Sequence, residues 1–428
     1  MSWPIGIAFL FVLIFGGVPV AIAMGIVGLV GTASIIGIEP AWFLFGAVYF
    51  DSGRNYTLSV VPLFILMGNL VIQSGVATDL YRTANAWMRH FRGGLALATI
   101  VASGGFASIS GSSLATTATL SRIALPEMRK YGYADRLAGA SVAAGGTLGI
   151  LIPPSVILVL YGIMTQEHIG KLFLAGMIPG LLGVIFYLVA VRLSVMGGDE
   201  GMERQDKLPL ADRIRSLRGV VTTLLLFAFV LGGIYLNVFT ATEAAGIGAA
   251  GAFVVTALRG RLVFRETLQT LFDTTKTTAL MFLILFGAMA FLNYVNLSGL
   301  TGDLDSFVIS LGAHPYAVVF AILLVYLVLG CVLESISMIL LTVPIFHPLV
   351  TSMGFDGIWF GIVVVVAAEL SFITPPIGMN LFVLRATARD IRMNQIYRGI
   401  VPFVGVDLVR LLLIVLVPGI VSLFGLLY

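Results

Sequence analysis

Two short polar clusters stand out in an apolar chain, because each gathers hydroxyl residues where the neighbouring sequence is rich in Leu, Val and Ala. The first is SISGSSLATT over 108–117 and the second is ESIS over 334–337. Hydroxyl and carbonyl oxygens are ligands for small hard cations, and free N–H groups at a helix start attract carboxylates. Small residues also favour plain helix packing in membranes. The density of polar residues favours a binding site over packing alone.

A Pro-Pro pair follows each cluster. The first lies in LIPPS over 151–155 and the second in ITPPIGMN over 373–380. Two successive prolines remove two backbone donors and free carbonyls about one turn earlier, so each apolar segment is expected to be discontinuous, with a simple kink as the alternative. We expect a cation cage at each break, facing the polar cluster of the same half. Its ligands would be carbonyls near Ile152 and Thr374, the Ser155 and Thr374 hydroxyls, and the Asn380 amide.

Ionisable residues are rare in the apolar segments, and each is a functional hypothesis. Glu334 belongs to the second cluster and Glu369 precedes the second Pro-Pro pair, where either could bind a cation, take up a proton or bond to the backbone. Asp407 and Arg410 share one helix face, which indicates an ion pair with a structural or subunit-contact role. The four histidines are scattered. No nucleophile motif, P-loop or dinucleotide fingerprint occurs, so we predict neither an enzyme nor a nucleic-acid partner.

The chain has 428 residues, of which 59% are hydrophobic and 11% charged, against roughly 25% charged residues in soluble domains. We therefore predict an all-α polytopic membrane protein. Two long stretches with polar centres, 93–127 and 315–349, are predicted to be re-entrant helical hairpins. Segments 137–164 and 357–384 are predicted to be broken transmembrane helices. The nine expected spans are 5–36, 58–76, 137–164, 169–195, 219–237, 241–258, 277–297, 357–384 and 399–427.

Basic residues mark one side of this layout. Of the 24 Lys and Arg residues, all but Arg54, Lys171 and Arg410 fall in loops on a single side. The positive-inside rule identifies that side as cytoplasmic. We expect a cytoplasmic N-terminus, a periplasmic C-terminus, a first hairpin that opens inward and a second that opens outward.

An internal repeat appears when the sequence is shifted by 222 residues. Ser113 then aligns with Ser335, and Pro153-Pro154 with Pro375-Pro376. We predict a first inverted repeat over 1–195, a cytoplasmic linker plus connecting span over 196–237, and a second inverted repeat over 238–428. Amphipathic segments at 40–57 and 262–276 are expected to brace a fixed scaffold or to be plain interfacial helices. Inverted repeats with broken helices are typical of secondary transporters.

The runs GSSLATTATL, GILIPPS, LESISMILLTVPI and ELSFITPPIGMNLFV resemble the large, DctM-type membrane subunit of tripartite ATP-independent periplasmic (TRAP) transporters, within the ion transporter superfamily. The resemblance spans essentially the whole chain. It implies an inverted-repeat, elevator-type transporter in the bacterial inner membrane, driven by sodium at two or more sites and without an organic cofactor. It also implies a small four-helix membrane subunit and a periplasmic substrate-binding protein as partners, surrounding lipid, and a carboxylate substrate such as sialic acid or a C4-dicarboxylate.

The same resemblance places sodium and substrate between each hairpin tip and the facing helix break. In the first half these residues are Ser110, Gly111, Ser112, Ser113, Thr116, Ile152, Pro153, Pro154 and Ser155. In the second half they are Glu334, Ser335, Ser337, Thr374, Pro375, Pro376, Gly378 and Asn380. Glu334 departs from the family pattern, in which a shorter Asp is expected. The alternatives are a stand-alone anion symporter without a binding protein, a polytopic membrane enzyme and a passive channel.

Overall fold

The computed structural model describes residues 1–196 and 205–422, and these residues form helices joined by turns and short loops, without a β-strand. The all-α prediction is confirmed. The first half contains α1 (Trp3–Phe15), α2 (Val20–Ile36), α3 (Ile38–Arg54), η1 (Tyr56–Ser59), α4 (Val60–Gln73), α5 (Val76–Met88), α6 (Gly94–Ser110), α7 (Ser113–Lys130), α8 (Asp135–Thr147), α9 (Val156–Thr165) and α10 (Ile169–Met196). The second half contains α11 (Leu210–Tyr235), α12 (Ala241–Leu258), α13 (Phe264–Leu297), α14 (Leu300–Ser310), α15 (Pro315–Leu329), α16 (Ser335–Ser352), α17 (Gly357–Ser371), α18 (Met379–Thr387), α19 (Met393–Leu416) and α20 (Gly419–Ser422).

Helix bounds recur at the shift of 222 residues. α7 and α16 begin at the two aligned serines, and α8 and α17 begin at aligned positions as well. The pairs α2 and α12, α5 and α14, α6 and α15, α9 and α18, and α10 and α19 also overlap at this shift, and α3 and α4 together overlap α13. Residues 197–204 of the predicted linker, including Arg204, and residues 423–428 of the predicted second repeat lie outside the described residues.

The helix starts follow from local capping. The Ser112 hydroxyl accepts the Ala115 N–H at the start of α7, and the Asp356 carboxylate accepts the Trp359 N–H at the start of α17. At the start of α12, Thr240 and Glu243 form a reciprocal capping box. These side chains satisfy N–H groups that have no partner inside the helix.

The expected span at 5–36 is wrong as a single helix. It forms α1 and α2, which pack against each other across a turn that contains Gly17 with φ +87° and Pro19. The N-terminal amine of Met1 donates a hydrogen bond to Ser34 near the end of α2. The N-terminus therefore lies beside the end of α2. The expectation of a cytoplasmic N-terminus assumed that 5–36 crosses the membrane once as a single helix, and the structure does not support that assumption.

Three other expectations differ from the structure. The amphipathic segment 262–276 and the span 277–297 form one continuous helix, α13, of 34 residues. The connecting span at 219–237 belongs to α11, which begins nine residues earlier, because the polar start of this helix is still compatible with helical backbone. The short helices α5 and α14 were not expected. Their mixed polar sequences carry little hydropathy signal.

Seven helices of the described residues are long and apolar enough to cross a membrane. Six of them match expected spans, and the seventh is α16 of the second hairpin. The other three expected spans are each divided into two shorter helices: 5–36, 137–164 and 357–384. The chain is therefore a polytopic membrane protein with interrupted spans.

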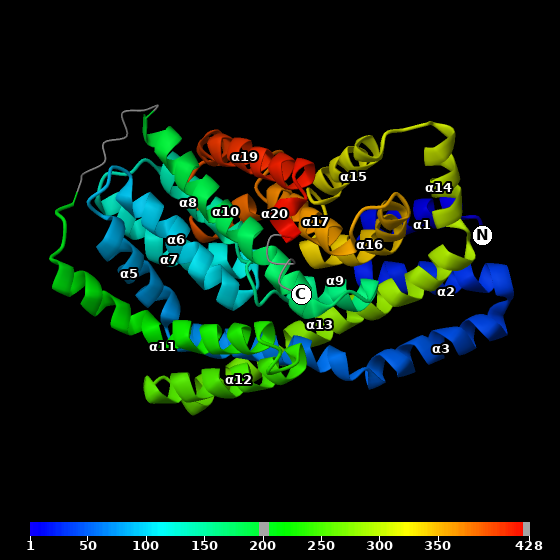
Figure 1. Ribbon diagram of the computed structural model, residues 1–428, viewed down its shortest axis with the longest axis horizontal. Coiled ribbons are helices and arrows are strands. Elements are labelled where there is room, and N and C mark those ends of the chain that lie inside the picture. Colours follow the sequence, from blue (N-terminus) through cyan, green and yellow to red (C-terminus); the bar gives the residue numbers. More distant parts are fainter. Residues whose placement is uncertain (197–204, 423–428) are drawn as a thin grey trace.

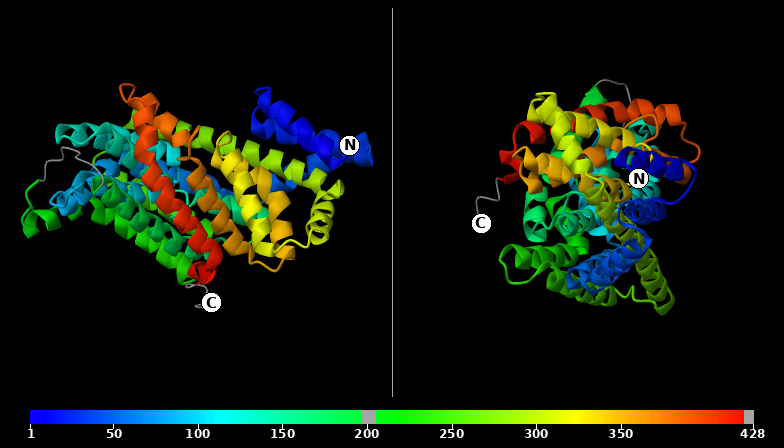
Figure 2. Two further views of the ribbon diagram at one scale, coloured as in Figure 1. Left: turned by 90° about the horizontal axis from the view of Figure 1, so that it is seen from above. Right: turned by 90° about the vertical axis from the view of Figure 1, so that its right-hand side faces the viewer.

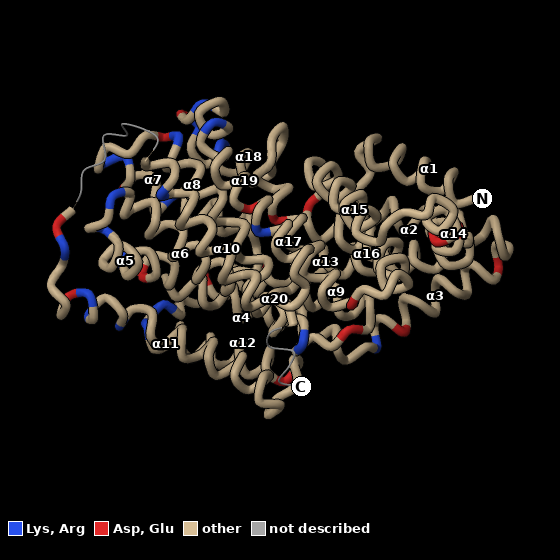
Figure 3. The backbone as a smooth tube through the Cα atoms, turned by 45° about the horizontal axis from the view of Figure 1, so that its top comes forward, with Lys and Arg blue, Asp and Glu red and all other residues tan. Residues whose placement is uncertain are grey.

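In Figure 1 the second hairpin (α15 and α16), α9 and α17 lie near and to the right of the centre, whereas the first hairpin (α6 and α7) and α8 lie toward the left, beside α5. α5 and α11 lie at one end, and α1, α2, α3 and α14 lie at the other. Figure 2 shows α19, in red, crossing the middle, where it packs against α8, α10 and α17. Lys and Arg gather around α5, α7 and the start of α11, whereas the charged residues near α14 and α3 are mainly acidic (Figure 3).

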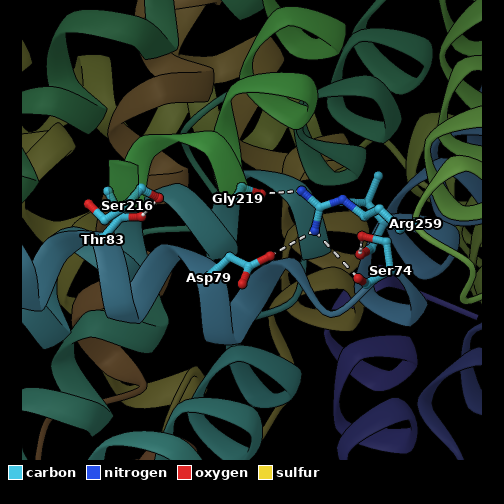
Figure 4. Close-up of polar contacts among 7 residues, drawn as sticks. Ser74, Asp79, Thr83, Ser216, Gly219 and Arg259 are labelled. Atoms are coloured by element: carbon cyan, nitrogen blue, oxygen red, sulfur yellow. Dashed lines mark hydrogen bonds and ion pairs between the residues drawn. The ribbon is translucent and has the colours of Figure 1, made fainter. Parts of the chain in front are cut away.

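Polar contacts fix α5 to two long helices (Figure 4). Arg259, just after α12, donates to the Asp79 carboxylate at 2.8 Å and to the Gly219 carbonyl of α11. One turn along α5, the Thr83 hydroxyl donates to the Ser216 carbonyl at 2.8 Å. Because α5 leads directly into the first hairpin, these contacts anchor one end of that hairpin to α11 and α12.

Candidate functional site

The tip of the first hairpin is a compact hydrogen-bonded turn. α6 ends at Ser110, and Gly111 adopts φ +60°, a conformation that favours glycine. The Ser110 and Thr116 hydroxyls share a hydrogen bond of 2.8 Å across the turn, and Ser112 caps α7. The hydroxyls that the sequence singled out here therefore organise the tip itself.

Asn380 meets the first hairpin, although we expected it to face the hairpin of its own half. Its amide nitrogen donates to Ser113 Oγ at 2.7 Å and to the Ala143 carbonyl at 3.0 Å, and its Oδ1 lies 2.9 Å from the same hydroxyl. All of these groups are buried. The expectation is wrong because α18 packs against α7, as α9 packs against α16. The second part of each broken helix thus crosses to the hairpin of the other half.

The first break runs over 148–155 and is closed to solvent. Pro153, Pro154 and Ser155 are buried, and Ile152 is half-buried. The Ser155 hydroxyl donates to the Ile150 carbonyl and accepts the Leu158 N–H at 3.3 Å, which caps α9. The carbonyl freed by the prolines is thus already satisfied from within the break.

The polar side chains at the tip of the second hairpin form fewer hydrogen bonds than those at the first. Glu334 precedes α16 at the N-cap position without a capping hydrogen bond from its side chain. Ser335 and Ser337 are buried, with 4% and 7% of their surface exposed. Within the part of the chain that the structure describes, neither hydroxyl forms a hydrogen bond.

The second break runs over 372–378 and is more open than the first. Pro375 and Pro376 are exposed, and the Tyr397 hydroxyl donates to the Pro376 carbonyl at 2.7 Å. The Thr374 hydroxyl donates to the Leu370 carbonyl of its own helix at 2.6 Å. Gly378 starts α18 with φ +57°, which again favours glycine.

Both hairpin tips open onto one cavity of about 220 Å³. Of the predicted site residues, the cavity brings together Ser110, Gly111, Ser112, Ser113, Glu334 and Ser335. Thr116 supports the first tip from behind, through Ser110. The predicted residues at the two breaks do not line the cavity; there the breaks and their flanks contribute Ile150, Val156, Ile157 and Phe372.

Two polar residues of the cavity wall were missed by the sequence reasoning. Asn69 on α4 and Thr277 on α13 face the hairpin tips from helices outside the hairpins and breaks. The Asn69 amide donates to the Thr274 hydroxyl at 2.9 Å, which joins α4 to α13. An amide in the middle of the apolar run 58–76 was the available signal, because buried polar groups in membrane spans are costly.

The cavity offers groups for an anion and for a cation. α7, α9 and α16 begin at residues 113, 156 and 335, all in the cavity wall, so three helix N-termini bring partial positive charge there. Hydroxyl oxygens and the Glu334 carboxylate lie in the same wall. No group of three or more His, Cys, Asp or Glu suited to a metal occurs in the described residues. A cation bound here would therefore rely on hydroxyl and carbonyl oxygens and on the single carboxylate of Glu334, a set that suits a weakly held hard ion.

Comparisons of the sequence and of the fold with known proteins both find membrane transporters. Residues 7–420 match the family model described as the DctM component of tripartite ATP-independent periplasmic transporters. A C4-dicarboxylate TRAP transporter large permease protein of Pseudomonas aeruginosa is 35% identical over 87% of this chain and 86% of its own length. A sialic acid TRAP transporter large permease protein of Vibrio cholerae is 32% identical over 95% and 94%. The solved YdaH transporter of Alcanivorax borkumensis has a similar fold, with a TM-score of 0.62 and 15% identity over 90% of both chains.

Proposed function

Because this chain belongs to the DctM component family of tripartite ATP-independent periplasmic transporters, we propose that it imports a carboxylate by sodium-coupled alternating access. Members of the family are transporter permease subunits, so the alternative of a membrane enzyme is wrong. The observation that carries the proposal is the shared cavity. Both hairpin tips and both helix breaks contribute to it, and its wall combines helix N-termini with oxygen ligands.

The proposed substrate is an organic acid. Three helix N-termini at the cavity favour a carboxylate group. Backbone N–H groups at a helix start can donate hydrogen bonds to a carboxylate, and the helix dipole favours negative charge at that position. The relatives named for C4-dicarboxylates and for sialic acid support this class, because both substrates are carboxylates. Sodium bound beside Ser335 and Glu334 would offset the repulsion between that carboxylate and Glu334.

The proposed movement is an elevator. The hairpins and broken helices would form the moving unit, and α4 and α13 the fixed frame. Asn69 and Thr277 of the frame face the hairpin tips across the cavity, so the site lies on the boundary between the two parts. A unit that carries its own ion sites past such a wall exposes the substrate to each side in turn.

The proposed assembly contains a small four-helix membrane subunit and a periplasmic substrate-binding protein in the bacterial inner membrane. The tripartite family description supports a complex of three components. We also propose that both termini are periplasmic. The positive-inside rule, applied to the basic loops, supports a periplasmic position for the end of α2, and Met1 lies against that end.

Reconstitution tests the proposal. The chain, its small membrane subunit and its binding protein are placed in liposomes, and uptake of radiolabelled succinate and sialic acid is measured under sodium or potassium gradients. We expect uptake of at least one acid only with an inward sodium gradient and with the binding protein. Uptake that is indifferent to sodium would overturn the coupling. Full uptake without the binding protein would identify a stand-alone symporter instead.

A further inference from the structure

A buried charge cluster lies behind the cavity, away from its walls. Arg410 Nη2 donates to Glu369 Oε2 at 2.7 Å, and Arg410 Nε lies 2.8 Å from Asp407 Oδ1. All three side chains are 0% exposed. The sequence indicated an ion pair between Asp407 and Arg410, but the structure adds Glu369 from α17. Arg410 therefore links α19 to the last turn of the helix that precedes the second break.

The cluster also reaches the first break. A side chain at Gly183 of α10 would collide with Arg410 Nη1 and would lie about 3.0 Å from Leu148, so the glycine leaves room for the guanidinium beside the start of the break. One turn along α10, the Tyr187 hydroxyl shares a hydrogen bond of 3.0 Å with Thr147. Thr147 is the last residue of α8.

Thr147 and Glu369 occupy equivalent positions in the two halves, because they are 222 residues apart. Each lies at the end of the helix that precedes a break, in α8 and in α17. Both side chains are fully buried. A purely structural ion pair would need to contact only one of these helices. Arg410 contacts the end of α17 through Glu369, and it lies against α10 at Gly183, one turn from the tyrosine that bonds to the end of α8.

We propose that Arg410 is a positioning residue that holds the two helix breaks in one relative arrangement and thereby couples the proposed cation sites. The inference rests on the proposed sodium coupling. Arg410 does not line the cavity. It acts through Glu369 on the turn before Thr374. Its guanidinium also lies against α10 at Gly183, one turn from the tyrosine that bonds to Thr147. If either helix end shifts, a buried charge or hydroxyl loses its partner, and the other end is affected as well.

Sodium titration of the purified chain tests this inference. The midpoint of thermal unfolding is measured against sodium concentration, with potassium chloride keeping the ionic strength constant. Variants Glu369→Gln and Tyr187→Phe are compared with wild type, because the first removes the negative charge that pairs with Arg410 and the second removes the hydrogen bond to Thr147. Both leave the Asp407–Arg410 pair in place. We expect each variant to raise the half-maximal sodium concentration about tenfold or more, as loss of groups behind a metal site does.

Tyr326→Phe is the matched control. Tyr326 is also a fully buried tyrosine whose hydroxyl pairs with a threonine, Thr342, but both lie within the second hairpin. We expect this variant to keep the wild-type sodium midpoint. Equal sodium midpoints in wild type, Glu369→Gln and Tyr187→Phe, with only a lower sodium-free unfolding temperature, would show a structural role and overturn the inference.

The double variant Glu369→Gln/Tyr187→Phe tests the coupling itself. The effects of independent sites multiply, whereas contacts in one network depart from the product of the single effects. Here we expect a combined shift smaller than the product, because either single change already releases the shared arrangement. A multiplicative shift would overturn the coupling. Failure of the proposed function looks different, because wild type itself would then show no stabilisation by sodium over potassium.

Discussion

The two hairpin and break pairs have the same helix pattern but use their polar groups differently. In the first half, Ser110, Ser113 and Ser155 all bond to neighbouring protein groups, and the prolines of the break are buried. In the second half, the Ser335 hydroxyl and the Glu334 carboxylate lie in the cavity wall without protein partners among the described residues. The polar groups of the first half are thus already hydrogen-bonded within the protein, which we call pre-bonded. The second half keeps polar groups free to bind a ligand.

This difference assigns distinct tasks to the two halves. A pre-bonded tip changes little when a ligand binds, because its hydrogen bonds already fix its shape. A tip whose hydroxyls are unpaired gains hydrogen bonds when a ligand binds. Binding there is favourable because a buried hydroxyl without a hydrogen-bond partner is unfavourable. We expect changes in the first half to affect stability, and changes in the second to affect ligand dependence.

Asn380→Ala should give the largest loss of stability, because Asn380, although it lies in α18 of the second half, is the hydrogen-bond partner of Ser113 at the first tip. The change leaves the buried Ser113 hydroxyl without its partner, at about 1–3 kcal/mol for an unsatisfied buried group, and removes a second hydrogen bond from the Ala143 carbonyl. Thermal unfolding without sodium measures the loss. Asn394→Ala, an exposed asparagine at the start of α19, is the control and should change stability by less than about 0.5 kcal/mol. Equal effects in the two variants would remove the basis for calling the first half pre-bonded.

The paired variants Pro154→Ala and Pro376→Ala compare the two breaks. Both restore a backbone donor and let the helix continue, so both should lower sodium-driven uptake, by about 10–100-fold as for groups that orient ligands. Only Pro154→Ala should also lower stability, because Pro154 is buried and Pro376 is exposed; two lost methylenes correspond to about 1.6 kcal/mol. Normal transport by either variant would mean that the broken helix is dispensable at that position.

Glu334→Gln should weaken the response to sodium while sparing the fold. The side chain makes no capping hydrogen bond, so the isosteric amide removes a charge and little else. We expect roughly a tenfold higher half-maximal sodium concentration for uptake. Glu266→Gln on the exposed start of α13 is the matched control. An unchanged sodium response would exclude the Glu334 charge from the cation site.

The sequence predicted the helical fold, the two hairpins and the interruption of two spans, because these features depend on local hydropathy and on proline. It did not predict that 5–36 divides into two helices or that α13 is continuous. Gly17 and Pro19 are compatible with a kinked span as well as with a turn. The polar start of α13 fits an interfacial helix as well as the end of a longer one.

The contacts of the site were harder to predict than its residue types. The sequence identified Ser113 and Asn380 but placed them in separate sites, since nothing in a single sequence shows that α18 crosses to the hairpin of the other half. It identified Glu369, Asp407 and Arg410 but not their contact, which joins two helices. Asn69 and Thr277 were missed because isolated polar residues at helix positions carry no pattern.

The most direct test compares Ser113→Ala with Ser335→Ala, the aligned serines of the two tips. Thermal unfolding of the purified chain is followed across a sodium titration at constant ionic strength. Ser113→Ala should lower stability without sodium by about 0.6–1.7 kcal/mol, the range for hydrogen bonds between membrane helices. Ser335→Ala should leave sodium-free stability unchanged and raise the half-maximal sodium concentration roughly tenfold. Equal loss of sodium-free stability in both variants, with a wild-type sodium response in Ser335→Ala, would contradict the division between a pre-bonded half and a ligand-dependent half.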